Sequence, residues 1–258
     1  MQDEVEFITP DWKVPRHVHA YVSLRKGGVS QGCYQGFNLA SHVGDISSDV
    51  MGNRSLLGES LCLAGKPHWL NQIHSTRVIE LSSQTNEDII DADAAWTEEK
   101  NQTCVVLTAD CLPVFFYHPD EQKVAVTHAG WRGLVDGIIE KTIQQMTTRP
   151  EQLVVWLGPA IGPCQFEVGE EVMSAFCNKD AEAKQCFEFT RQAISQQHFL
   201  ADIYQLAKRR LYTSGVTNIS GGDFCTVSDP ERFFSYRRDG QTGRMANLIW
   251  MTEAELRS

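Results

Sequence analysis

The stretch between residues 104 and 133 constrains the fold more than any other part of the chain. Asp110 and Cys111 are flanked by two apolar runs, CVVLTA and LPVFFY, and a third run, KVAVTH, ends at His128. Short runs rich in β-branched and aromatic residues, separated by Pro-Asp and glycine, are typical of strands joined by tight turns. We therefore expect Asp110, Cys111 and His128 at strand ends, where a sheet holds side chains rigidly and glycines admit a ligand.

Cys111 and His128 have a structural explanation as well as a functional one. A free cysteine often packs as a small hydrophobe, and a histidine can be hydrogen-bonded inside a core. Imidazole and thiolate are also zinc ligands, and His74, in the β-rich stretch 68–81, would supply a third. Cys111 and His128 could equally form a thiolate–imidazolium dyad for acyl transfer, with Asp110 nearby. Spacing alone leaves these interpretations open, because nothing local determines the geometry.

The pattern elsewhere predicts one α+β domain over residues 1–258, with mixed β-sheets. Strands outnumber helices, and several strands follow one another directly. Helical spacing and capping residues predict helices over 47–63, 134–148, 169–177 and 199–213. β-Rich runs predict further strands at 16–24, 68–81, 91–99, 151–158, 216–220, 233–238 and 244–251.

Several arginines lie where an anion could bind. Arg54 lies on the apolar stripe of the helix 47–63, where a guanidinium group either meets an anion or reaches out to water at the edge of the stripe. The turn 236–244 is basic and is either a phosphate site or a solvated hairpin tip. Arg132 adjoins Gly133, at the start of a helix whose free N–H groups could face an anion.

Charge and composition exclude several classes of function. The net charge of −10 argues against nucleic-acid binding, which depends on Lys and Arg. The acidic N-terminus has no apolar signal region, and no run approaches the roughly 18 apolar residues of a membrane helix. The eight cysteines form no C-x-x-C pair. We therefore expect a cytoplasmic protein with reduced thiols that acts away from membranes.

Motifs along most of the chain resemble those of the YfiH family, also called the laccase-domain or polyphenol oxidase family and known as peptidoglycan editing factor PgeF. The resemblance extends from about residue 20 to 250. Its most specific element is TADC followed, after sixteen residues, by HAGWRG. The motifs are GGVS, FNLASHVGD, Asn53-Arg54, NQIHSTRV, TADCLPV, VTHAGWRG, GPAIGPC, FEVGEEV and FFSYRRDGQTGRMA.

The resemblance implies a fold, a metal and an activity. The fold is a sandwich-like core of mixed β-sheets flanked by helices, similar to the catalytic domain of cytotoxic necrotising factor. The metal is Zn²⁺, with Cu²⁺ as the alternative, held by ligands that match His74, Cys111 and His128. The activity is phosphorolysis of adenosine, inosine and methylthioadenosine, together with deamination of adenosine. The family's pocket residues match Asn38 and Arg54.

We therefore expect a zinc-dependent purine nucleoside phosphorylase with adenosine deaminase activity. The expected partners are purine nucleosides and phosphate, and the expected assembly is a monomer or a homodimer. The candidate catalytic residues are Asp110, Cys111 and His128, and the candidate substrate-binding residues are Asn38, Arg54 and Arg132.

Two other enzyme classes remain open at this point. One is a copper-dependent polyphenol oxidase, although a multicopper centre needs many imidazoles and the chain has eight histidines with a single H-x-H pair, His17 and His19. The other is a Cys–His hydrolase or amidase that edits peptidoglycan precursors.

Overall fold

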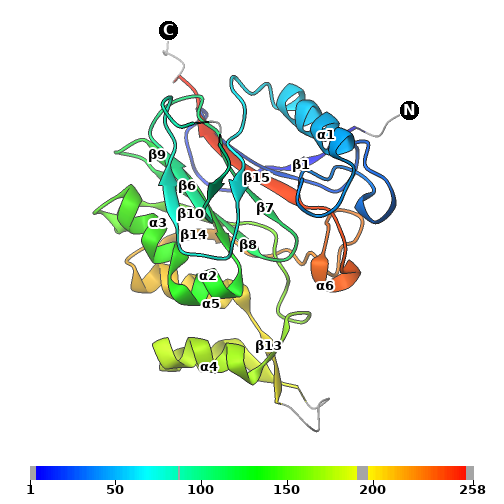
Figure 1. Cartoon of the computed structure of the whole chain (residues 1–258). Helices are drawn as coiled ribbons and strands as arrows, with labels where there is room; N and C mark the ends of the chain where they lie inside the picture. Colours follow the sequence, from blue (N-terminus) through cyan, green and yellow to red (C-terminus); the bar gives the residue numbers. More distant parts are fainter. Residues whose placement is uncertain (1–3, 87, 191–196, 254–258) are drawn as a thin grey trace.

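Two β-sheets packed face to face form the centre of the fold (Figure 1). The computed structural model describes residues 4–86, 88–190 and 197–253. The four-stranded antiparallel sheet has the order β1-β2-β15-β7, with bounds Phe7–Ile8, Val18–Ser23, Met245–Met251 and Cys104–Thr108. The six-stranded sheet has the order β14-β10-β8-β9-β6-β4, with bounds Asn218–Gly221, Val154–Leu157, Leu112–His118, Lys123–Ala129, Ala94–Thr97 and Val78–Glu80. Its β10–β14 and β4–β6 pairs are parallel, so the predicted α+β fold with mixed sheets is confirmed.

Helices cover both outer faces of this sandwich. Helix α1 (Ser47–Ser60) packs with the segment 37–40 against the four-stranded sheet. Helices α2 (Trp131–Asp136), α3 (Ile138–Met146) and α5 (Ile203–Thr213) pack against the six-stranded sheet (Figure 1). Smaller elements complete the chain: the sheet β11-β13-β12 (Glu167–Gly169, His198–Ala201, Phe187–Phe189), α4 (Glu170–Lys179), the pair β3 and β5 (Leu70–Asn71, Ile90–Asp91) and α6 (Tyr236–Asp239). No helix within the described ranges has the length and apolar character needed to span a membrane.

The central stretch crosses from one sheet to the other. Strand β7 belongs to the four-stranded sheet and ends at Thr108, whereas β8 belongs to the six-stranded sheet and begins at Leu112. Asp110 and Cys111 therefore form the corner between the sheets, and Asp110 has the left-handed φ of 100°. Strands β8 and β9 pair so that Pro113 lies opposite His128. Cys111 and His128 thus meet at the same end of the sandwich.

These strands are buried on both faces, which explains their continuous apolar runs. In β8, Phe115 and Tyr117 pack between the two sheets, while Val114 and Phe116 pack against the helices. The burial of both faces makes the central stretch a rigid base for the side chains at its ends.

Two predicted helices were wrong in extent. The helix predicted over 134–148 is divided into α2 and α3, because Gly137 adopts a left-handed φ of 100° that ends α2. The helix predicted over 199–213 includes residues of strand β13, and α5 begins only at Ile203. The side chain of Asp202 caps α5 by accepting a hydrogen bond from the N–H of Gln205.

One predicted strand was also wrong, and the strands of another predicted stretch are shorter than expected. The stretch 68–81 contains only the short strands β3 and β4, and His74 lies between them with a left-handed φ of 59°. The stretch 233–238 ends in helix α6, because the side chain of Ser235 accepts a hydrogen bond from the N–H of Arg238 and starts a helical turn. In both stretches, contacts with distant elements bury the apolar residues. A strand along the whole stretch is therefore not needed to bury them.

Candidate metal centre

Three side chains from separate parts of the chain converge at one end of the sandwich. His74, Cys111 and His128 each offer a ligand atom, and these atoms all lie within 4.8 Å of one another. The Cys111 sulfur lies 3.9 Å from Nε2 of His74, and the two imidazole rings are 4.9 Å apart between centroids. His128 is buried, Cys111 is half-buried and His74 is exposed, so the group opens from the core towards the surface. The structure thus brings together all three residues of the expected ligand set.

The separation of these atoms fits a zinc ion. With Zn–S near 2.3 Å and Zn–N near 2.0–2.1 Å, tetrahedral geometry separates a sulfur and a nitrogen ligand by about 3.5 Å. The Cys111 sulfur and His74 Nε2 are 3.9 Å apart, so a small adjustment would bring both into range. Two imidazoles and one thiolate leave a fourth position for water or substrate, which is the pattern of a catalytic zinc site.

Asp93, which the sequence did not indicate, lies behind these side chains and orients two of them. Its carboxylate is fully buried and accepts a hydrogen bond from Nδ1 of His128 at 2.8 Å. It also accepts the N–H of His74 at 3.0 Å, and both the N–H and the hydroxyl of Ser75 at 2.6 and 2.8 Å. A carboxylate on Nδ1 leaves Nε2 of His128 for a metal, which is the usual arrangement around histidine ligands.

The environment of Asp93 also holds it ionised. Burial alone would raise its pKa, but the hydrogen bonds from His128 and Ser75 outweigh burial and lower the pKa below the ordinary 3.8. The signal in the sequence is weak: Asp93 is the second aspartate of the segment Asp91-Ala92-Asp93, directly before strand β6. Nothing in that segment distinguishes a buried aspartate from an exposed one.

Cys111 and His128 form a thiolate–imidazolium pair. Burial opposes the charged form of Cys111, but the adjacent His128 and His74 outweigh it and lower the thiol pKa to about 6. Burial likewise opposes a charged His128, but Cys111 and Asp93 outweigh it and raise the imidazole pKa to about 9. At neutral pH the sulfur is therefore already in the form that binds metals and acts as a nucleophile.

Metal affinity is expected to rise with pH as a consequence. Between pH 6 and 9, Cys111 is ionised and His128 still carries a proton. Metal binding must displace that proton, so the apparent affinity should rise by about tenfold per pH unit across this window. Competition with a chromophoric chelator at pH 6.5, 7.5 and 8.5 would measure the slope. An affinity that stays constant over this range would contradict the protonated state of His128.

Gly130 lies against the ligands and leaves room for them. A Cβ atom at this position would lie 2.8 Å from Cδ2 of His74 and 3.1 Å from the Cys111 sulfur. Its backbone, with φ of −65° and ψ of 159°, is open to any residue, so the need for glycine is steric. The first glycine of the HAGWRG motif, Gly130, is therefore needed for the packing of the candidate metal ligands.

Gly130→Ala is expected to keep the fold and to weaken metal binding about 10–100-fold, the range seen when ligand orientation is disturbed. The displaced ring of His74 and the displaced sulfur of Cys111 are the cause. Gly58→Ala in α1 is the matched control, because a Cβ there meets nothing within 4 Å. Metal content after dialysis against a weak chelator compares the two variants. Equal metal retention by both would show that Gly130 makes no steric contribution to the site.

Asp110 lies beside the metal ligands, but both of its carboxylate oxygens already accept hydrogen bonds from protein groups. One oxygen accepts a hydrogen bond from the hydroxyl of Thr226, and the other accepts the N–H of Arg237 at 2.6 Å. The backbone oxygen of Asp110 accepts the N–H of Ile161 at 2.9 Å. Asp110 thus ties three segments together next to Cys111. This geometry suits a positioning role better than proton transfer.

Asn38 is fully buried and its side-chain amide is bonded to protein groups. It donates to the carbonyl of Ala40 at 3.2 Å and to Asp45 at 2.8 Å, and it accepts the N–H groups of Ala40 and Arg244 at 3.1 and 3.0 Å. The side chain of Asn38 therefore stabilises the segment that follows it, and its amide is bonded to protein groups and not directed towards a ligand.

The two candidate substrate-binding arginines lie in different surroundings. Arg54 is half-buried, donates from Nε to the carbonyl of Leu39 at 3.0 Å and stacks on Trp69 at 3.8 Å. Burial lowers its pKa to about 10, so it stays charged at neutral pH. Arg132 is exposed and lies over the ring of Trp131 at 4.3 Å. Leu39 and Trp69 lie against the guanidinium group of Arg54, as its place on the apolar stripe of the helix predicts.

The two histidines near the N-terminus have separate protein partners. His19 forms a hydrogen bond with the hydroxyl of Thr252 and stacks on Trp250, whereas His17 forms a hydrogen bond with the side chain of Gln122. Within residues 4–86, 88–190 and 197–253, His74, Cys111 and His128 form the one cluster of three or more His, Cys, Asp or Glu side chains close enough to hold a metal.

Comparison with known proteins places the chain in a family. The family model described as multi-copper polyphenol oxidoreductase laccase matches residues 19–252. The chain belongs to this laccase-domain family. Its relatives include a protein of Haemophilus influenzae named purine nucleoside phosphorylase, 48% identical over 246 residues, with 95% of this chain and 99% of the relative covered. The purine nucleoside phosphorylase YfiH of Escherichia coli strain K12 is 45% identical over 249 residues, with the same coverage.

Solved structures of laccase-domain relatives have the same fold. The crystal structure of a Neisseria meningitidis protein matches with a TM-score of 0.89 and 45% identity, covering 96% of this chain and 99% of that one. YlmD from Geobacillus stearothermophilus matches with a TM-score of 0.81 and 28% identity, covering 92% and 93%. The YfiH resemblance expected from the sequence motifs is confirmed.

Proposed function

We propose that this chain is a zinc-dependent purine nucleoside phosphorylase that acts on adenosine, inosine and methylthioadenosine and also deaminates adenosine. The observation that carries the proposal is the convergence of His74, Cys111 and His128 in front of the buried Asp93. The relatives named purine nucleoside phosphorylase cover nearly the whole of this chain, and they support an enzyme with nucleoside and phosphate substrates.

The residues of the candidate site have different roles in this proposal. His74, Cys111 and His128 would hold the metal, and Asp93 orients His128 through Nδ1. A bound Zn²⁺ would supply Lewis acidity and would lower the pKa of water towards about 7. Arg54 offers a half-buried positive charge for the phosphate co-substrate.

The proposal includes a cytoplasmic location and no nucleic-acid or membrane partner, with the chain acting as a monomer or homodimer. All eight cysteines are free thiols, as is usual for a protein in a reducing compartment. The net charge of −10 supports the absence of a nucleic-acid partner.

Copper chemistry is the second candidate, because the family description names a multi-copper polyphenol oxidoreductase. The described part of the chain holds one cluster with three ligands, which suits a single ion. Copper bound at these ligands would give at most one ion per chain. Metal analysis showing several copper ions per chain, together with oxidation of phenols, would favour the multicopper alternative.

Product analysis tests the proposed function. Metal-replete, folded protein is incubated with inosine and phosphate, and separately with adenosine. We expect hypoxanthine and ribose 1-phosphate from the first mixture and inosine from the second. Omission of phosphate should stop the first reaction and leave the second. If none of these products forms, the proposed function is wrong.

A further inference from the structure

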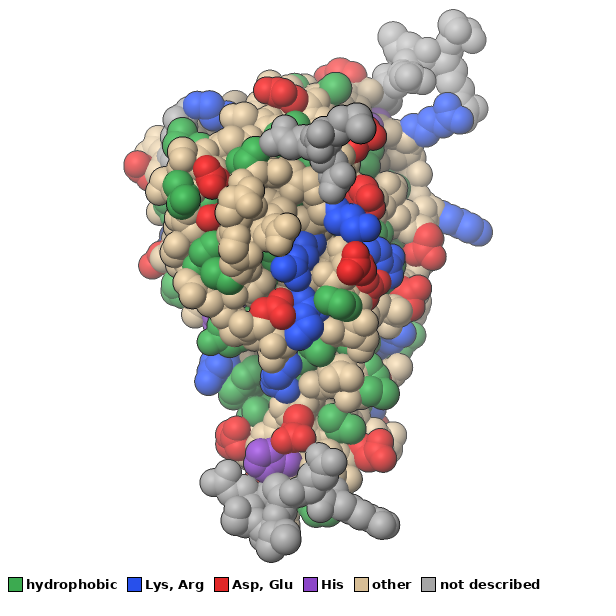
Figure 2. Space-filling model, turned by 90° about the vertical axis from the view of Figure 1, so that its right-hand side faces the viewer, with side chains coloured by type: hydrophobic (Ala, Val, Ile, Leu, Met, Phe, Trp, Pro, Cys, Tyr) green, Lys and Arg blue, Asp and Glu red, His purple; other side chains and the backbone are tan. Residues whose placement is uncertain are grey.

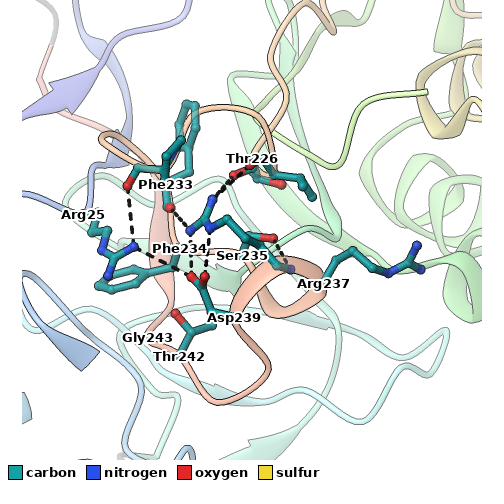
Figure 3. Close-up of polar contacts among 12 residues, drawn as sticks. Arg25, Thr226, Phe233, Phe234, Ser235, Arg237, Asp239, Thr242 and Gly243 are labelled. Carbon is teal, nitrogen blue, oxygen red and sulfur yellow. Dashed lines mark hydrogen bonds and ion pairs between the residues drawn. The ribbon is translucent and has the colours of Figure 1, made fainter. Parts of the chain in front are cut away.

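The basic turn 236–244 contains arginines with two different tasks. Lys and Arg side chains gather in the middle of the face that carries α6, interspersed with acidic residues (Figure 2). Arg238 donates to the carboxylate of Asp239 and to the carbonyls of Thr226 and Phe233 at 2.9 Å (Figure 3). Arg237 donates to the carbonyls of Gln165 and Glu167 at 3.2 and 2.9 Å. These two arginines join the turn to neighbouring loops, so their charges serve the fold.

Arg244, at the end of the same turn, is not used in this way. Its Nη1 donates only to the adjacent carbonyls of Thr242 and Gly243, at 2.8 and 3.0 Å. No carboxylate in the described part of the chain lies within 4.0 Å of Arg244 or of Arg54. Both guanidinium groups are half-buried. A half-buried cation without a carboxylate partner is costly unless an anion binds to it.

Arg54 and Arg244 are attached to the same short segment. The carbonyl of Leu39 accepts from Nε of Arg54 at 3.0 Å, and the N–H of Leu39 donates to the carbonyl of Arg244 at 3.4 Å. Asn38 accepts the N–H of Arg244 at 3.0 Å. Burial lowers the pKa of His42, in the same segment, and the charges of Arg244 and Arg54 lower it further.

The turn that carries Arg244 is built to lie close to this segment. A Cβ at Gly243 would lie 2.9 Å from Cβ of Asn38 and 2.7 Å from Phe234, so only glycine permits the close approach. Asn38 therefore acts through Arg244, because its side-chain oxygen accepts the N–H of that arginine and holds its backbone beside the segment 37–40.

The turn that carries Arg244 also lies close to the candidate metal ligands, because Asp110, next to Cys111, accepts the N–H of Arg237 in that turn. Burial lowers the pKa of Arg244, and the negative charges of Cys111 and Asp110 act in the opposite direction. These two residues lie at the corner between the sheets, beside His128. The exposed ring of Tyr236 lies 5.8 Å from the Arg244 guanidinium carbon. The charge of Arg244 therefore lies at the edge of the metal centre and not on a separate surface.

We propose that Arg244 binds the phosphate co-substrate together with Arg54. This inference rests on the proposed function and deepens it. In phosphorolysis a phosphate oxygen forms a bond to the ribose C1′ while the C1′–N9 bond breaks. The electron pair of that bond leaves with the purine, which takes up a proton from water. Two guanidinium groups offset the charge of the phosphate dianion and hold it in a defined orientation.

Direct binding of inorganic phosphate tests the inference independently of turnover. Isothermal titration compares the metal-replete wild-type protein with Arg244→Gln, Arg54→Gln and Arg232→Gln. We expect the Kd for phosphate to rise about 10–100-fold in the first two variants, the usual effect of losing a charged hydrogen-bond donor. Arg232 is the matched control, since its guanidinium is paired with Asp229 at 2.6 Å. Its loss should leave the Kd unchanged.

Kinetics supply a second measurement. In Arg244→Gln the KM for phosphate should rise while the KM for inosine changes little, and the metal content should equal that of the wild-type protein. Arg244→Lys keeps the positive charge but loses the forked N–H donors of the guanidinium group. Its Kd for phosphate should therefore lie between that of the wild-type protein and that of Arg244→Gln. This variant also serves if Arg244→Gln fails to fold.

The possible results separate this inference from the proposed function. An unchanged phosphate Kd and an unchanged KM for phosphate in the Arg244 variants would overturn the inference, even if inosine is cleaved. Phosphate binding that depends on both arginines, in a protein that cleaves no nucleoside, would support the phosphate site and refute the phosphorylase activity.

Discussion

Cys111→Ala is expected to abolish both metal binding and nucleoside cleavage. The thiolate is one of three ligands, and its pKa of about 6 keeps it ionised at neutral pH. Loss of an outer partner of a metal ligand already costs about 10–100-fold, so loss of the ligand itself should lower kcat/KM by more than about 100-fold. Metal analysis and single-time-point product assays on the same preparation measure both effects.

Chelation separates the metal enzyme from a Cys–His hydrolase. A metal enzyme loses activity on chelation and recovers it when Zn²⁺ is restored, whereas a thiolate–imidazolium dyad would act without metal. His74→Ala adds a third comparison, because His74 is a ligand of the metal site but only a neighbour of the dyad formed by Cys111 and His128. A metal enzyme should lose its activity in this variant, whereas a hydrolase that uses the dyad should keep activity. Cys177→Ala is the matched control, since Cys177 is a free, half-buried thiol on α4. Activity that survives chelation but not Cys111→Ala would favour the hydrolase.

Asp93→Asn is expected to weaken metal binding about 10–100-fold, as loss of a carboxylate behind a histidine ligand usually does. The buried Asp93 carboxylate accepts from His128, His74 and Ser75. In the variant an NH₂ group replaces one carboxylate oxygen and faces N–H groups that need an acceptor. Buried hydrogen bonds are then lost, and the ring of His128 is no longer held through Nδ1. The free energy of unfolding should also fall, by about 3 kcal/mol.

Asp91→Asn supplies the comparison for Asp93, since Asp91 is exposed and bonds only the side chain of Asn71 at 2.7 Å. Urea unfolding at several pH values gives a further check. The pKa of Asp93 is lowered in the folded protein, so its contribution to stability is present at neutral pH and is lost on acidification below the ordinary carboxyl pKa of 3.8. The stability difference between the wild-type protein and Asp93→Asn should therefore shrink in acid. A constant difference would contradict the ionised state of Asp93.

The expected strands and helices were correct where the local pattern decides them. Strands β7, β8 and β9 match the apolar runs of the central stretch to within one residue, and α1 occupies most of 47–63. The errors at Asp202 and Ser235 have a different origin. Each residue is an N-cap that starts a helix next to apolar residues, and those residues are buried by contacts from distant elements. Local periodicity does not distinguish such residues from members of a strand or a helix.

The sequence by itself determined the rigid centre of the protein and the residues that its motifs mark. The apolar runs dictated three strands, and the TADC and HAGWRG motifs indicated Cys111 and His128 at their ends. Both features are local, since a strand needs only a continuous run of residues that tolerate burial on two faces.

Only the tertiary structure decided how the candidate site is completed. Asp93 reaches His128 across 35 residues, Asp110 reaches Arg237 across 127, and Asn38 reaches Arg244 across 206. Asp93 resembles an exposed polar residue in the sequence, because its partners come from other strands and loops. The hydrogen bonds of these residues depend on the packing of the two sheets, which brings the ends of β7, β8 and β9 together with the loops around them.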